Sequence, residues 1–217
     1  EGVARLNTGI MFKSLFGKGK EQRTSRRARP VMDDSIRSAE VGDEVAIFGL
    51  TEGFDDVYRT VERRDSFVVE QKNRYGSDAG EWFEVIGEDG ERRFWVEWAE
   101  EDDLFVTATT HKRPMGLATV DLTEEKLVQM DEDNSIDNHF TSGGTRYYYK
   151  NSQEVIYYED EEGDGEEFYL WDFVSLEEKR VLSVVKWEGV PFQVFISEVV
   201  PPGKISVSMA GTPGSRG

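Results

Sequence analysis

The sequence predicts an all-β protein, mainly antiparallel, in which two related four-strand meanders form a sandwich or barrel-like core with at most one short helix. Runs rich in Val, Ile, Tyr, Phe and Trp alternate with turns that contain Gly or Asp, as strands and hairpins do. Residues 67–106 and 154–193 also share one order of strands and turns at a spacing of ~87 residues. With 13 Phe, 8 Tyr and 5 Trp, a chain of 217 residues can bury a sizeable core.

The two copies can be laid over each other without a gap, but few residues are identical between them. The match therefore lies in the succession of strands and turns, and it predicts a shared shape rather than a shared reaction. The identical pairs are Val68 with Val155, Glu91 with Glu178, Arg93 with Arg180, and Phe105 with Phe192.

Residues 1–40 are predicted to be a flexible basic arm. Between positions 11 and 30 the chain carries seven Lys/Arg and one Glu, without sustained apolar periodicity. Met11 resembles a natural start, which leaves open whether residues 1–10 are native. Bulky apolar groups beside lysines suit a peptide that contacts a membrane surface or a protein partner, and a disordered start with chance phenylalanines is the alternative. The residues concerned are Phe12, Lys13, Leu15, Phe16, Lys18 and Lys20.

The first meander is predicted over residues 41–120. After the Gly42-Asp43 turn, the run that contains Val45 and Ile47 reads as an opening strand. The pair Asp89-Gly90 indicates a tight hairpin, because both residue types tolerate positive φ. Strands such as 82–87 carry apolar residues on both faces, so we expect them to lie between two packed layers.

Residues 121–144 are predicted to connect the meanders. Within them, 122–130 form the one expected helix, with Thr123 as its N-cap, and 131–138 form a loop. The second meander follows over 145–208 and ends in a short strand. Residues 209–217 are expected to be a disordered tail rich in Gly and Ser.

The net charge of −18 is concentrated outside the arm and excludes some classes of partner. An acidic body repels nucleic acid, so no nucleic-acid partner is expected. The acidity itself fits either a solubility role or adaptation to high intracellular salt. The chain has no cysteine, which excludes disulfides and thiolate chemistry, and it has no apolar run long enough to span a membrane. We expect a soluble, cytoplasmic protein.

Catalytic residues and cofactors are not predicted. His111 and His139 lie in no recognisable catalytic motif, and no Gly-rich phosphate-binding loop opens a helix. Asp160, Glu162 and Asp164 match the first alternating positions of a calcium loop, but Trp171 stands where a bidentate Glu is required. These three acidic residues are a candidate cation site, and a solvated turn is the simpler interpretation.

Four tryptophans are candidates for an aromatic pocket between the two repeats. Tryptophans of this kind also serve simply as core residues, so both interpretations stay open. The four are Trp82, Trp95, Trp171 and Trp187.

Several aromatic strand motifs resemble a prokaryotic family known as domain of unknown function 4178. The likeness spans about residues 41–207, and the opening MFKSLFG also resembles such proteins. The family has no assigned activity, and its frequent association with membrane-stress proteins implies a cytoplasmic accessory protein near the membrane. The motifs that carry the likeness are VGDEV at 41–45, EWFEV at 81–85, FWVEW at 94–98, YYY at 147–149, Glu154-Val155, 168–173 and LSVVKWEG at 182–189.

From these observations we expect a non-enzymatic accessory or adaptor protein that binds another protein, with possible contact to the cytoplasmic face of the membrane through the arm. The alternative is a module that binds a small molecule or a divalent cation between the two β repeats. An enzyme is the third and least supported class, because no residue pattern supplies its chemistry.

Overall fold

The computed structural model describes residues 36–50, 64–100, 103–110 and 113–209. The arm residues Phe12 to Lys20 and His111 lie outside this part of the chain. Within it, eleven strands form one mainly antiparallel sheet, so the predicted fold class is confirmed. The strands are β1 (Glu44–Phe48), β2 (Arg64–Ser77), β3 (Gly80–Glu88), β4 (Arg93–Glu100), β5 (Leu104–Thr109), β6 (His139–Ser142), β7 (Thr145–Tyr158), β8 (Glu166–Ser175), β9 (Arg180–Trp187), β10 (Gln193–Val199) and β11 (Ile205–Ser208).

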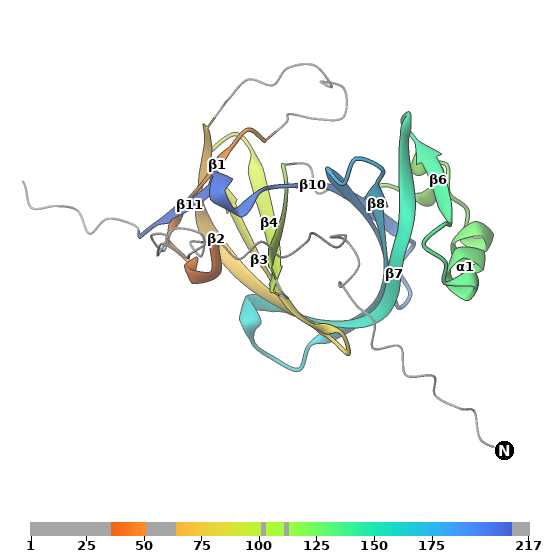
Figure 1. Ribbon diagram of the computed structural model, residues 1–217. Coiled ribbons are helices and arrows are strands. Elements are labelled where there is room, and N and C mark those ends of the chain that lie inside the picture. The colour runs from red at the N-terminus through yellow and green to blue at the C-terminus, as the bar shows by residue number, and fades with distance from the viewer. Residues whose placement is uncertain (1–35, 51–63, 101–102, 111–112, 210–217) are drawn as a thin grey trace, which may run out of the picture.

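Eight of these strands close into a ring. The sheet order is β11-β1-β2-β3-β4-β5-β10-β9-β8-β7-β6, and β2 also pairs with β7. This extra pairing joins the two ends of the series from β2 to β7, and Figure 1 shows the two long strands meeting at the bottom of the view. The meander β2–β5 supplies one side of the ring and the meander β7–β10 supplies the other.

The two meanders have the same construction. Each begins with a 14-residue strand that carries a β-bulge, between Val69 and Gln71 in β2 and between Tyr149 and Asn151 in β7. Each long strand pairs with a short strand along its first half, β1 on β2 and β6 on β7, and the two long strands pair with each other along their second halves. The predicted pair of related meanders is therefore present.

The gap-free alignment of the two copies is wrong in detail. β3 begins at Gly80 and β8 at Glu166, whereas β2 begins at Arg64 and β7 at Thr145, so the spacing is not constant. The cause is the connection after the long strand. It is the two-residue turn 78–79 in the first copy and the longer segment 159–165, with the 3₁₀ helix η3 (Glu159–Glu161), in the second.

Three apolar clusters hold the ring and its flanks. The first lies between β1, β11 and the outer face of β2–β5, with Phe67 stacked on Phe94 at a ring separation of 5.0 Å. The second lies on the outer face of β7–β10, under the 3₁₀ helix η2 (Leu117–Val120) and α1 (Glu124–Asp133). The third joins the two halves from inside the ring. Each half of the ring therefore has an apolar cluster on its outer face and shares the third cluster on its inner face, in line with strands that carry apolar residues on both faces.

The predicted helix and its cap are present. Thr123 is the N-cap, and its hydroxyl accepts a hydrogen bond from the Lys126 N–H at 3.2 Å. The helix extends to Asp133, three residues beyond the predicted end at Met130. It stops at Asn134, whose φ of 43° is left-handed.

Packing into the core begins before residue 40, the boundary predicted for the arm. The 3₁₀ helix η1 (Ile36–Ser38) belongs to it, and both Ile36 and Ala39 are buried in the first apolar cluster. A further 3₁₀ helix, η4 (Pro202–Lys204), precedes β11, the predicted last short strand. Among the described residues, no helix is both long and apolar enough to cross a membrane.

Candidate functional site

The candidate functional site is the interior of the ring, because residues of both meanders face it. Side chains that lie directly opposite each other on paired strands point to the same face. In the first meander Asn73 lies opposite Glu84, Glu84 opposite Glu97, and Glu97 opposite Thr107. These four polar side chains therefore form one row across β2, β3, β4 and β5.

The second meander contributes a matching row. Asn151 lies opposite Asp172, Asp172 opposite Ser183, and Ser183 opposite Phe195. The Lys150 ammonium, at the bulge of β7, lies 5.2 Å from the ring centre of Phe105 on β5. Because β5 and β7 are not neighbours in the ring, this contact crosses the interior and shows that both rows face the same space.

An aromatic cluster fills the interior next to the pairing of β2 with β7. Tyr75 stacks on Trp82 at 5.2 Å and meets the edge of Phe168 at 6.2 Å. Phe168 in turn lies 4.5 Å from Trp187, and Tyr157 lies 5.2 Å from Tyr75. These contacts involve five strands from both halves, so aromatic packing as well as backbone pairing joins the meanders.

Glu84 is a buried carboxylate held in place by neutral partners. Its side chain is 2% exposed, and its Oε1 accepts hydrogen bonds from Asn73 Nδ2 at 3.0 Å and from the Tyr75 hydroxyl at 3.1 Å. Asn73 Oδ1 accepts from the Asp160 N–H and from Gln71 Nε2. This network ties η3 to β2 and β3, and it gives Glu84 a structural role.

Asp172 is the inward carboxylate of the second meander. Burial raises its pKa, against the opposing effects of Lys150 and of the Ser183 hydroxyl, which donates to Asp172 Oδ1 at 2.6 Å. Asp172, Asn151, Ser183 and Phe195 all face inward, yet each keeps an intermediate exposure. Part of each of these four side chains therefore remains accessible to solvent.

The four tryptophans that were predicted to converge lie in three different surroundings. Trp82 and Trp187 do converge, in the aromatic cluster that joins the halves. Trp95 lies opposite Ile86 and Thr109 on the inward face of β4. Trp171 lies on the other face of β8, in the apolar cluster under α1, because strand residues alternate between faces.

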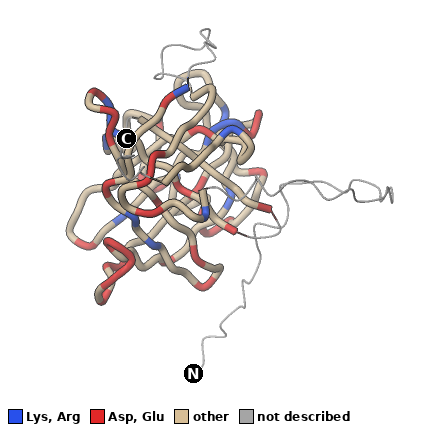
Figure 2. The backbone as a smooth tube through the Cα atoms, turned by 90° about the vertical axis from the view of Figure 1, so that its left-hand side faces the viewer, with Lys and Arg blue, Asp and Glu red and all other residues tan. Residues whose placement is uncertain are grey.

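Trp187 also lines an open depression at one end of the ring. The depression has a volume of about 340 Å³. Its other lining residues are Glu166, Glu167, Glu188, Val190 and Gln193. Figure 2 shows acidic residues along many loops of one side of the molecule, with fewer basic residues among them.

The described carboxylates of the acidic turn are not gathered into one cluster. No group of three or more His, Asp or Glu side chains that could hold a metal ion occurs in the described ranges, so Asp160, Glu162 and Asp164 do not assemble one. The turn instead packs against β2, where Lys72 lies 3.5 Å from Glu161. His139 is an exposed residue at the start of β6, and its Nδ1 lies 2.9 Å from the Asp137 carbonyl oxygen.

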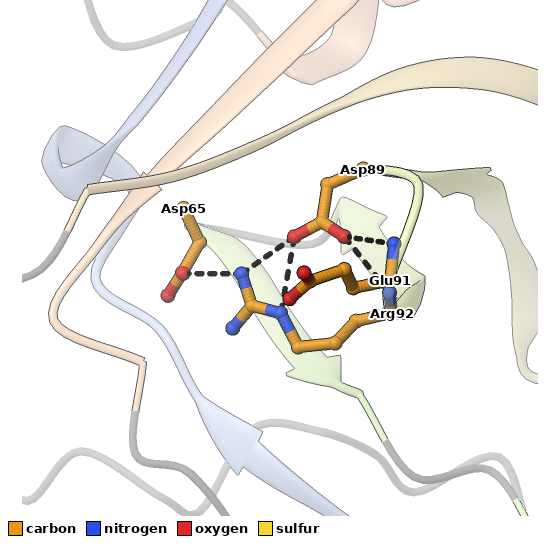
Figure 3. Close-up of polar contacts among 4 residues, drawn as sticks. All are labelled: Asp65, Asp89, Glu91 and Arg92. Atoms are coloured by element: carbon orange, nitrogen blue, oxygen red, sulfur yellow. Dashed lines mark hydrogen bonds and ion pairs between the residues drawn. The ribbon is translucent and has the colours of Figure 1, made fainter.

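An ion-pair cluster at the β3–β4 hairpin, with the buried Asp65 as one member, was not predicted (Figure 3). Arg92 Nη2 lies 2.8 Å from Asp65 Oδ1 and 2.6 Å from Asp89 Oδ2, and Asp65 is 2% exposed. Burial works to raise the pKa of Asp89, but the N–H groups of Glu91 and Arg92 and the Arg92 guanidinium lower it to about 2. The cluster fixes the hairpin to the start of β2.

A second polar cluster lies under α1, on the outer face of the ring. The Tyr149 hydroxyl donates to Ser152 Oγ at 3.0 Å, the Tyr169 hydroxyl donates to the same atom at 3.2 Å, and Ser152 Oγ donates to Asp131 Oδ1. Asp131 belongs to the helix, so the cluster attaches α1 to β7 and β8. Nothing in the spacing of these residues indicates their contact.

A comparison with protein families identifies the domain. The family model described as "Domain of unknown function (DUF4178)" matches residues 63–202. The chain belongs to this family. All eight ring strands lie within the matched residues of the DUF4178 domain, whereas β11 and β1 lie outside them. No curated protein and no solved structure matches the chain.

Proposed function

We propose that this DUF4178 domain is a non-enzymatic binding module that holds a small molecule inside the ring, between its two halves. The observation that carries the proposal is the orientation and partial exposure of Asn151, Asp172 and Ser183. They face inward from paired strands and keep part of their surface exposed. Eight-stranded rings either fill their interior with side chains or hold one small ligand.

The chemistry of the interior supports binding rather than catalysis. Polar groups on the two rows can orient a ligand, while Phe105, Phe195 and Trp95 offer apolar and aromatic surface, the combination typical of ligand pockets. Glu84 is engaged by Asn73 and Tyr75, which suits a structural group better than a proton donor.

Native mass spectrometry of the protein purified from its own cells tests this proposal. We expect a co-purified small molecule that is released on unfolding. The variant Ser183→Phe places a bulky ring on the inward face and should abolish the bound mass. The matched variant Ser206→Phe, at an exposed position of β11, should keep it. Retention of the ligand by Ser183→Phe would contradict an interior site.

A second function, an adaptor for another protein, is favoured by the depression at Trp187. Three glutamates around an indole suit a Lys or Arg side chain of a basic partner segment, through charge and cation–π attraction. The adaptor proposal also includes peripheral contact with the cytoplasmic face of the membrane through the basic arm. The residues of the arm lie outside the described ranges.

Two changes in a pull-down from native cells separate the parts of the adaptor proposal. Replacing Glu166, Glu167 and Glu188 by glutamine should release a partner bound at the depression. Deleting residues 11–29 should release a partner or a membrane contact made through the arm. Unchanged recovery of the same proteins in both variants would refute the adaptor role.

A further inference from the structure

The charges on the inward face indicate which class of small molecule the ring would take. Three carboxylates lie on the two rows, Glu84, Glu97 and Asp172, and the Lys150 ammonium also reaches the interior, where its charge acts on Asp172. Glu84 is held by neutral donors in its own meander. The excess of acidic groups favours a positively charged guest over an anion.

Asn151 Oδ1 and the Asp172 carboxylate are hydrogen-bond acceptors on the inward face of the second meander. Asn151 Oδ1 is buried and accepts no hydrogen bond within the protein. Asn151 lies directly opposite Asp172, which accepts from Ser183 through Oδ1. A buried acceptor without a donor is costly, and a desolvated carboxylate gains more from a cation than a solvated one does.

The same region has aromatic surface beside the acceptors. Phe195 lies opposite Ser183, next to Asp172 in the row, and the Lys150 ammonium lies 5.2 Å from the Phe105 ring. An ammonium group already rests against an aromatic ring within this interior, a contact that cation–π attraction favours. The apolar part of a guest would extend toward the aromatic cluster at Tyr75 and Phe168.

We propose that the ring binds a small molecule with a protonated primary amine on an apolar chain, and that Asp172 and Asn151 receive its N–H groups. This inference rests on the proposed binding function and adds the chemical class of the ligand. The three N–H donors of a primary ammonium match the acceptors Asn151 Oδ1 and the Asp172 carboxylate. Charge-assisted hydrogen bonds of this kind are the stronger class.

Binding of three probes of equal length tests the inference by calorimetry on the full chain at neutral pH. The probes are hexylammonium, 1-hexanol and hexanoate. We expect hexylammonium to bind at least about tenfold more tightly than hexanol, and hexanoate more weakly than either, because a charge-assisted hydrogen bond is worth roughly twice a neutral one. Asp172→Asn, which keeps the side-chain shape, should remove that preference, and Asn151→Ala should reduce it.

A control separates the interior from the acidic surface. Glu177→Gln changes an exposed carboxylate in the β8–β9 turn and should leave hexylammonium binding unchanged. Ser183→Phe should abolish binding of hexylammonium and hexanol alike. Hexylammonium binding that survives Ser183→Phe, or that falls equally in Glu177→Gln, would place the amine on the surface and overturn the inference.

The result also distinguishes this inference from the binding function on which it rests. Equal affinity for hexanol and hexylammonium, both lost in Ser183→Phe, would refute the amine class while supporting an interior site. Absence of binding for all three probes, together with no co-purified small molecule, would refute the binding function itself.

Discussion

Gly76 on β2 lies directly opposite Ile156 on β7, at the pairing that closes the ring. Each residue stands five positions after the first paired residue beyond the bulge of its strand, Gln71 in β2 and Asn151 in β7. Gly76 and Ile156 are thus equivalent residues of the two halves. A pair of equivalent residues facing each other marks an approximate two-fold axis, so the two meanders meet symmetrically at this point.

Removal of Arg92 should be strongly destabilising. The Arg92 guanidinium lies 2.8 Å from the carboxylate of Asp65, which is 2% exposed. Loss of the guanidinium would leave this buried negative charge without the positive charge of Arg92. For Arg92→Leu we expect the free energy of unfolding to fall by about 3–5 kcal/mol, the cost of breaking a buried pair from one side. Urea denaturation followed by tryptophan fluorescence measures this change.

The neighbouring arginine is a matched control for that variant. Arg93 Nη1 lies 3.7 Å from Glu88, and both side chains are nearly half exposed. Arg93→Leu should therefore change the free energy of unfolding by less than about 1 kcal/mol. Equal effects of the two variants would show that the Asp65–Arg92–Asp89 cluster does not stabilise the hairpin.

Gly87→Ala should disrupt the pairing of β2 with β3. A Cβ at position 87 would lie 1.9 Å from the Val68 carbonyl oxygen, a backbone atom that cannot move without shifting the strand. We expect a loss of at least about 2 kcal/mol, as for other overpacked interior sites. Thermal melts of the purified variant measure this loss. Gly116→Ala, where nothing lies within 4 Å of the added Cβ, should have little effect in such melts.

Stability should fall at alkaline pH through Tyr149. Burial, supported by the Asp131 carboxylate and opposed by the Ser152 hydrogen bond, raises the pKa of Tyr149 from 10.0 to about 12. A raised pKa in the folded state contributes stability that is present below pH 10 and is lost as the pH rises toward 12. The contribution is at most about 2–3 kcal/mol.

The variant Tyr149→Phe checks this contribution. Because the variant has no hydroxyl to ionise at this site, its free energy of unfolding should decline less steeply between pH 10 and 12 than that of the unaltered protein. Denaturant titrations at a series of pH values provide the slopes. Identical slopes would mean that the Tyr149 hydroxyl does not contribute to the alkaline loss of stability.

Much of the fold could be predicted from the sequence because its signals are local. Alternating apolar residues and Gly- or Asp-containing turns defined the strands, and the hydroxyl of Thr123 marked the start of α1. The comparison of the two copies predicted their shared shape. It misplaced equivalent residues, because the 159–165 segment and the bulges change the spacing, and a slip of one residue moves a side chain to the other face of a strand.

The candidate site could be predicted only in part, because it depends on contacts between distant strands. Trp82 and Trp187 were identified as aromatic residues that could converge, but Trp171 was placed with them although it faces the other way. Asp172 and Asn151 carry no local signal. Their significance comes from the closure of β2 on β7, which periodicity within one strand cannot indicate.

A disulfide between positions 76 and 156 tests the closure of the ring most directly. The chain has no cysteine, and directly opposed residues of antiparallel strands have Cα atoms about 4.5–5.5 Å apart, within disulfide range. We predict that Gly76→Cys/Ile156→Cys oxidises fully within the monomer. Gly76→Cys/Tyr148→Cys, displaced along β7 by about 26 Å, should keep free thiols. Free thiols in the first variant, or equal oxidation of both, would contradict the closed ring of two meanders.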